Sequence, residues 1–143
     1  MLNEAVIAIA VLGVLASGLL VFVLAPLSAG TASSERSRAD LLAEEGISAA
    51  KDIRNDGWTN LVLGDHGIVK TTKWAFSGAS DATIDGPVTY TRVVNIATVN
   101  RDGSGNIVAS GGTVDPRTKK LTTTVTWTSV AGSTAIPILS ILL

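Results

Sequence analysis

The sequence contains no cysteine and only one histidine, His66. Without cysteine the chain can form no disulfide, no zinc–thiolate site and no iron–sulfur site. A single histidine also leaves most nucleophilic triads and histidine metal sites incomplete. We therefore expect no catalytic residues, no metal and no cofactor, and a protein that is not an enzyme.

Charged residues are also scarce, at 16% of the 143 residues against about 25% in a typical soluble domain. The shortage is local, because Glu4 is the only charged residue among the first 34. The rest of the chain balances its acids and bases, and the net charge is −1 at pH 7. Because the chain has no basic field to attract phosphates, we expect no specific nucleic-acid partner.

The first 30 residues form an apolar segment. Residues 5–29 are uncharged and mostly apolar. As a helix rising about 1.5 Å per residue, they are long enough to cross about 30 Å of hydrocarbon. A cleaved signal peptide would begin with basic residues, whereas this chain begins Met-Leu-Asn-Glu. Residues 1–30 are therefore predicted to form a membrane-spanning helix.

Glu4 stands at the head of this apolar segment. A carboxylate at the edge of a bilayer costs several kcal/mol if it is buried without a partner. The positive end of the helix dipole favours an acid in the first turn. The N-terminal amine of Met1 in a neighbouring copy of the chain would supply the opposite charge. We therefore expect Glu4 and Met1 to set the register between subunits.

The first 16 residues, MLNEAVIAIAVLGVLA, resemble the processed N-terminus of type IV pilins and pseudopilins. In that family the processed chain begins with a short apolar stretch and a glutamate, and about twenty apolar residues follow. The family glutamate is normally the fifth mature residue, whereas here it is the fourth. A second likeness, to pilin-like proteins of small uncultivated bacteria, rests on the segments 74–78, 100–107 and 115–127.

The resemblance implies a major pilin, a structural subunit that polymerises through its N-terminal helix into a type IV pilus-like filament used in adhesion or motility. It implies residence in the inner membrane first and in a cell-surface filament later. The implied partners are copies of the same chain, the membrane, a prepilin peptidase and the pilus assembly machinery, and the N-terminus would be methylated. Two alternatives stay open: a pseudopilin of a type II secretion or DNA-uptake system, and a membrane-anchored binding domain that never polymerises.

Gly13, Gly18 and Pro26 interrupt the apolar segment. Proline removes a backbone donor and clashes with the preceding turn, so we expect a bend or a melted stretch before Pro26. In the family, this part of the helix loosens when subunits enter the filament. An ordinary proline kink is the alternative. We expect helix to resume near Thr31 and to continue to residue 56, with charged residues, Glu35 among them, on its solvated face.

Small apolar residues recur at three- and four-residue spacing along this second helical stretch, which predicts one buried face. They are Ala39, Leu42, Ala43, Gly46, Ala49, Ala50 and Ile53. From residue 57 onward the pattern changes to that of strands, and residues 57–143 are predicted to form a variable loop followed by an antiparallel sheet. The fold class is therefore α+β, with a long N-terminal helix packed on a C-terminal antiparallel β-sheet, as in type IV pilins.

The predicted strands lie at 88–100, 106–110, 121–128 and 134–143, with turns at 101–105 and 114–117 and a loop at 58–86. Pro137 should confine the last strand to an edge or a bulge. Three further groups of residues have a functional interpretation, which we consider less well supported than a structural one. They are a calcium-like turn at Asn100, Asp102, Ser104 and Asn106, an acid–base pair at Asp65 and His66, and a stacking platform of Trp58, Trp74 and Trp127.

Overall fold

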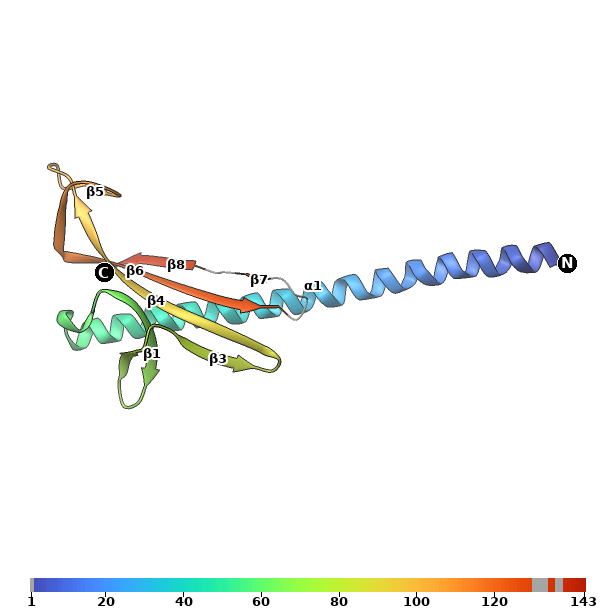
Figure 1. The fold of residues 1–143 in the computed structure, drawn as a ribbon, viewed down its shortest axis with the longest axis horizontal. Coiled ribbons are helices and arrows are strands. Elements are labelled where there is room, and N and C mark those ends of the chain that lie inside the picture. Colours follow the sequence, from blue (N-terminus) through green and yellow to red (C-terminus); the bar gives the residue numbers. More distant parts are fainter. Residues whose placement is uncertain (1, 130–133, 136–137) are drawn as a thin grey trace.

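The computed structural model describes residues 2–129, 134–135 and 138–143 (Figure 1). The side chains of residues 2, 8, 14–29, 134–135 and 138 are outside the described part, as is all of Met1. One long helix, α1 (Leu2–Asp56), is followed by a short 3₁₀ helix, η1 (Trp58–Asn60). The expected α+β class is confirmed, with the second half of α1 packed on an antiparallel sheet.

The sheet has eight strands in the described residues. They are β1 (Gly64–Lys70), β2 (Trp74–Ser77), β3 (Asp81–Asp85), β4 (Val88–Arg101), β5 (Ile107–Val108), β6 (Thr113–Thr128), β7 (Thr134–Ala135) and β8 (Ile138–Leu142). The two long strands β4 and β6 pair with each other along most of their length, and every pairing in the sheet is antiparallel. Strands β3, β1 and β5 pair with the other edge of β4, while β7 and β8 pair with β6.

The buried face of α1 is the one that the sequence predicts. Ala39, Ala43, Ala49 and Ala50 are fully buried, and Gly46 is buried among them. They pack against large side chains of β4 and β6, chiefly Val94, Ile96, Leu121 and Val125. Small helical side chains opposite large strand side chains let the helix backbone approach the sheet closely.

Glu35 departs from the expectation that it lies on the solvated face. It is only 6% exposed, and Trp127 donates an indole N–H to its carboxylate over 3.4 Å. The Tyr90 hydroxyl donates to its backbone carbonyl, also over 3.4 Å. Burial, followed by the nearby Glu35 and Asp85 carboxylates, raises the pKa of Tyr90, while Arg38 opposes the shift. The prediction was wrong because the ends of β4 and β6 reach further along α1 than helix periodicity can indicate.

Two predictions for the sheet were also wrong. Residues 58–86, expected as a loop, contain η1 and the three strands β1, β2 and β3. Strand β1 pairs with β2 and with β4, and β3 pairs with β4. Strand β6 begins at Thr113, so the expected turn at 114–117 lies inside it. The pairing of β4 with β6 jumps from Thr98↔Lys119 to Val99↔Asp115, so residues 116–118 form an irregularity that bends β6.

The helix does not restart near Thr31. Helix α1 is continuous from Leu2 to Asp56, through Gly13, Gly18 and Pro26. The expected restart is wrong for the single chain, because Pro26 lacks only one backbone donor and the bonds of the neighbouring turns maintain the helix. A break that forms when subunits assemble concerns the filament, and it stays a prediction.

Candidate assembly surface and pocket

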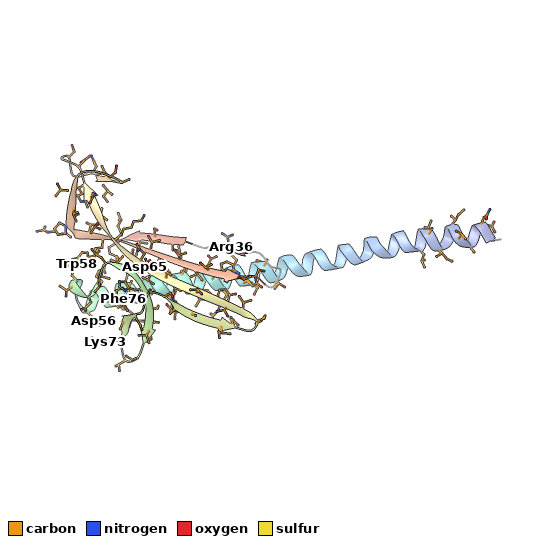
Figure 2. All side chains as sticks on the ribbon, in the orientation of Figure 1. Arg36, Asp56, Trp58, Asp65, Lys73 and Phe76 are labelled. Carbon is orange, nitrogen blue, oxygen red and sulfur yellow. The ribbon has the colours of Figure 1, made fainter. Side chains whose placement is uncertain are left out.

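The N-terminal half of α1 extends beyond the sheet (Figure 1). Among the residues of α1 with described side chains, burial begins at Glu35. Figure 2 shows the described side chains near the N-terminus standing free of the sheet, whereas Asp56, Trp58 and Phe76 lie at the opposite end of the molecule. The apolar residues near the N-terminus are therefore exposed, with the exposed fractions Val6 61%, Ile7 63%, Ile9 71%, Val11 53% and Leu12 70%.

These exposed side chains surround the helix. Successive residues of an α-helix turn by about 100°, so positions 6, 7, 9, 11 and 12 point in different directions around the axis. A helix that binds one partner has one apolar stripe, whereas a helix that is apolar all round is normally enclosed by protein or lipid. The described part of the chain supplies no such cover here. This surface, residues 5–13, is called the assembly surface below.

Five residues of this segment were predicted from the sequence to act in assembly or to interrupt the helix. Glu4 is exposed in the first turn of α1. A Cβ added to Gly13 would meet no other atom within 4 Å. Met1 and the side-chain surroundings of Gly18 and Pro26 lie outside the described residues.

No helix with a stretch long and apolar enough to cross a membrane is found among the described residues. The centre of the expected membrane-spanning segment, residues 14–29, lies outside the described side chains.

The sheet and the second half of α1, which packs on it, are called the head below. Arg92 of β4 connects the helix and the sheet within the head. Its guanidinium donates two hydrogen bonds to Asp81 of β3, at 3.2 and 2.7 Å. It donates two more to α1, to the Leu42 carbonyl at 2.9 Å and the Glu45 carboxylate at 2.7 Å. Burial opposes the charged form, but the bonds to Asp81 and Glu45 outweigh it and raise the pKa of Arg92. Helix and sheet are thus fixed to each other by a buried cation with several partners.

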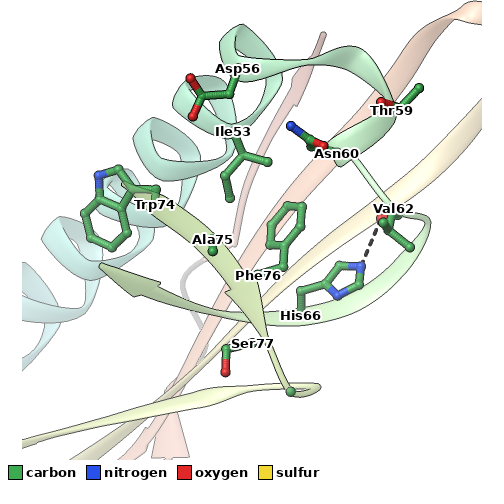
Figure 3. Close-up of a pocket in the computed structure, with 11 residues that line it drawn as sticks. Ile53, Asp56, Thr59, Asn60, Val62, His66, Trp74, Ala75, Phe76 and Ser77 are labelled. Atoms are coloured by element: carbon green, nitrogen blue, oxygen red, sulfur yellow. Dashed lines mark hydrogen bonds between the residues drawn. The ribbon is translucent and has the colours of Figure 1, made fainter. Parts of the chain in front are cut away.

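A pocket of about 510 Å³ lies between the C-terminal end of α1, η1, β1 and β2 (Figure 3). Ile53, His66, Trp74 and Phe76 are among the residues that line it. The imidazole of His66 is stacked on the ring of Phe76, with centroids 4.5 Å apart and planes 23° apart. Phe76 is not among the site residues predicted from the sequence, although alternation along β2 puts residues 74 and 76 on one face.

Asp65 and His66 do not form the acid–base pair considered from the sequence. His66 Nε2 is hydrogen-bonded to the Val62 carbonyl at 2.9 Å. The carboxylate of Asp65 accepts a hydrogen bond from the Asn95 amide at 2.6 Å. Adjacent strand residues point to opposite faces of a sheet, so the two side chains are directed apart.

The calcium-like segment is a hairpin turn between β4 and β5. One oxygen of Asp102 accepts the backbone N–H groups of Ser104 and Asn106, each at 2.9 Å, and the other accepts the Asn106 amide at 3.2 Å. These bonds, led by that from the Asn106 backbone, lower the pKa of Asp102. In residues 2–129, 134–135 and 138–143, no three acidic or histidine side chains gather as a metal site.

The three tryptophans do not form a common platform. Trp127 is buried in the core beside Tyr90, with ring centroids 5.8 Å apart. Trp58 and Trp74 are half-buried, with Lys119 and Lys70 respectively lying 5.0 and 5.1 Å from their ring centroids. The packing interpretation is confirmed for Trp127, and only Trp74 lines the pocket.

Comparison with known proteins gives no relative on which to base a function. No family model, curated protein or solved structure matches the chain. The function is therefore inferred from the residues and geometry of the chain itself.

Proposed function

We propose that the chain is the structural subunit of a type IV pilus-like filament and that it polymerises through the N-terminal half of α1. The observation that carries this proposal is the assembly surface, which is apolar around the whole helix and extends away from the head. The resemblance of residues 1–16 to processed pilins and pseudopilins supports the same function.

The apolar surface has two uses in this proposal. Before assembly the uncharged run of residues 5–29 holds the subunit in the membrane. On assembly the same side chains become buried against the helices of neighbouring copies. Full burial of a large apolar side chain stabilises by about 1.5–3 kcal/mol, so a helix enclosed on all sides gains enough to offset the cost of ordering the subunits.

Glu4 gives the polymer its register in this proposal. A bundle of apolar helices can slide with little change in buried area, whereas a carboxylate that meets the N-terminal amine of a neighbour fixes one axial position. Removing the carboxylate would leave that amine buried without a counter-charge, which typically costs about 3–5 kcal/mol.

The test is electron microscopy of sheared surface material from cells that produce the chain. We expect helical filaments composed of this chain, with helices inside and heads outside. The variants Glu4→Gln and Glu4→Ala should lower the amount of filament at least about tenfold, since a loss of 1.4 kcal/mol already gives that factor. The level of subunit in the membrane should not change.

The matched control is Asn3→Ala, which removes a polar side chain from the same turn without changing charge. This variant should assemble as the parent does. Filaments of parental length and abundance from both Glu4 variants would contradict the register role. Short filaments confined to the cell envelope would favour the pseudopilin, and membrane-bound subunits without any filament would favour the anchored binding domain.

A further inference from the structure

The pocket beside His66 is lined in part by Ile53 and Asp56, near the C-terminal end of α1. This end of the helix lies far from the N-terminus (Figure 1). The pocket has no role in the proposed assembly, because none of its lining residues belongs to the assembly surface. Its volume of about 510 Å³ falls within the roughly 300–1,000 Å³ typical of small-molecule sites. Four separate elements supply its walls, so its shape depends on the folded head.

Aromatic and aliphatic side chains form the apolar part of this pocket. In Figure 3, Ile53 and Phe76 lie in the middle, with Trp74 on one side and His66 on the other. Ile53 is buried, whereas the rings of His66, Trp74 and Phe76 are half-buried and present part of their surface to the pocket. Flat, half-exposed rings offer a surface on which an apolar molecular face can stack.

Trp74 and Asp56 line both this pocket and a smaller neighbouring hollow of about 370 Å³. Lys70, whose ammonium group lies 5.1 Å from the centre of the Trp74 ring, lines only the neighbouring hollow. Lys70 is thus not among the residues that line the pocket, whereas Trp74 is.

The polar part of the pocket consists of groups that recognise hydroxyls. Asp56, Thr59 and Asn60 are exposed, line the pocket and carry a carboxylate, a hydroxyl and an amide group, respectively. The carboxylate of Asp56 already accepts a hydrogen bond from Lys73 at 2.8 Å, and the two form an ion pair. The site thus offers several donors and acceptors with little net charge, which favours an uncharged ligand over an anion or a cation.

We propose that this pocket binds a neutral saccharide unit. A pyranose ring has C–H groups on its faces, which fit the surfaces of Trp74 and Phe76, and hydroxyls around its edge, which fit Asn60 and Asp56. A purely apolar ligand would make no use of the polar groups of the rim. The proposed binding needs only the pocket of a single subunit. It can therefore be tested on unassembled subunits, and it does not depend on filament assembly.

The experiment uses the full chain in phosphocholine micelles, because detergents with sugar headgroups would compete. The isotope-labelled protein is titrated with methyl glucoside, methyl galactoside, methyl mannoside and N-acetylglucosamine, and with glycerol and indole as comparison ligands. With at least one sugar, we expect saturable NMR shifts at the Trp74 indole and the Gly78 amide. The NMR signals of the Trp58 and Trp127 indoles should not shift.

Variants tie the binding to the pocket. Trp74→Ala should weaken the affinity at least about tenfold, which corresponds to 1.4 kcal/mol. Asn60→Ala, a change at an exposed residue, should weaken the affinity about threefold or more. This variant tests the proposal if Trp74→Ala does not fold. Trp58→Ala, the matched control, should leave the affinity unchanged within about twofold. Saturation by none of the four sugars, equal shifts with glycerol, binding of indole alone, or sugar affinity unaffected by the pocket variants would each overturn the proposal.

Discussion

At Gly46, α1 lies close to the sheet. A Cβ added there would lie 2.7 Å from Thr123 Cγ2 and 3.3 Å from Arg92 Cδ. Thr123 is fully buried and β-branched, so it has little freedom to move away. Glycine ordinarily weakens a helix, and its presence here is explained by the close contact between helix and sheet.

Gly46→Ala should therefore destabilise the head by about 1–3 kcal/mol, since overpacking outweighs the gain in helix propensity. The matched control is Gly30→Ala in the same helix, where the new Cβ would meet nothing within 4 Å. That change should leave the free energy of unfolding equal or raise it by up to about 1 kcal/mol. Thermal or denaturant unfolding of the two variants measures both effects, and equal stability of the two would contradict the close-packing argument.

A local polar cluster stabilises the bend of β6. At its bend, the Asp115 carboxylate accepts hydrogen bonds from Arg101 Nε and Thr118 Oγ1, both at 2.7 Å, and from the Arg117 backbone at 2.9 Å. Arg101 also donates to the Gly105 carbonyl at 2.8 Å, which connects the bend to the β4–β5 turn. One carboxylate thereby stabilises both the bend of β6 and the hairpin beside it.

These bonds, with Arg101 contributing most, lower the pKa of Asp115 from 3.8 to about 2. A lowered pKa means that the ionised form stabilises the bend. We therefore expect its contribution to be complete above pH 3.8 and to be lost as the pH falls through about 2. An NMR titration of the Asp115 carboxyl and the Arg117 amide measures this loss. Asp115→Asn should abolish the pH dependence of the Arg117 amide in this range, and a carboxyl that titrates near 3.8 would refute the argument.

At the scale of the whole molecule, the chain divides into a head with its own core and a helical extension. Two clusters of buried residues lie between the second half of α1 and the sheet, and none of their members precedes residue 39. The described side chains before Thr31 are exposed. The head should therefore keep its structure when the extension is removed.

Deleting residues 1–30 should give a soluble monomer that unfolds cooperatively, because the cut removes exposed apolar side chains and none of the described core. Size-exclusion chromatography and circular dichroism measure these properties. Deleting residues 1–44 is the contrasting variant, since it removes the buried Ala39, Leu42 and Ala43 and should unfold the head. Aggregation of the shorter deletion would indicate that the apolar C-terminal strand needs a neighbouring subunit to cover it.

Features that follow from local periodicity can be predicted from the order of the residues alone. The buried face of α1 and the position of β4 were predicted, because a repeat near 3.6 or 2 places side chains on one face whatever lies opposite. The apolar run of residues 5–29 was equally plain, and with it the candidate assembly surface. The roles of Glu4, Met1 and Pro26 in a filament are still predictions, because they depend on neighbouring copies.

Features that depend on partners distant in the sequence become visible in the folded chain. Residues 58–86 form strands because β4 offers them a free edge, and Glu35 is buried because Tyr90 and Trp127 reach it from strands far along the chain. The pocket likewise unites Ile53, His66 and Phe76, which belong to different elements. Strand pairing and burial draw their free energy from such distant contacts, and no local pattern contains them.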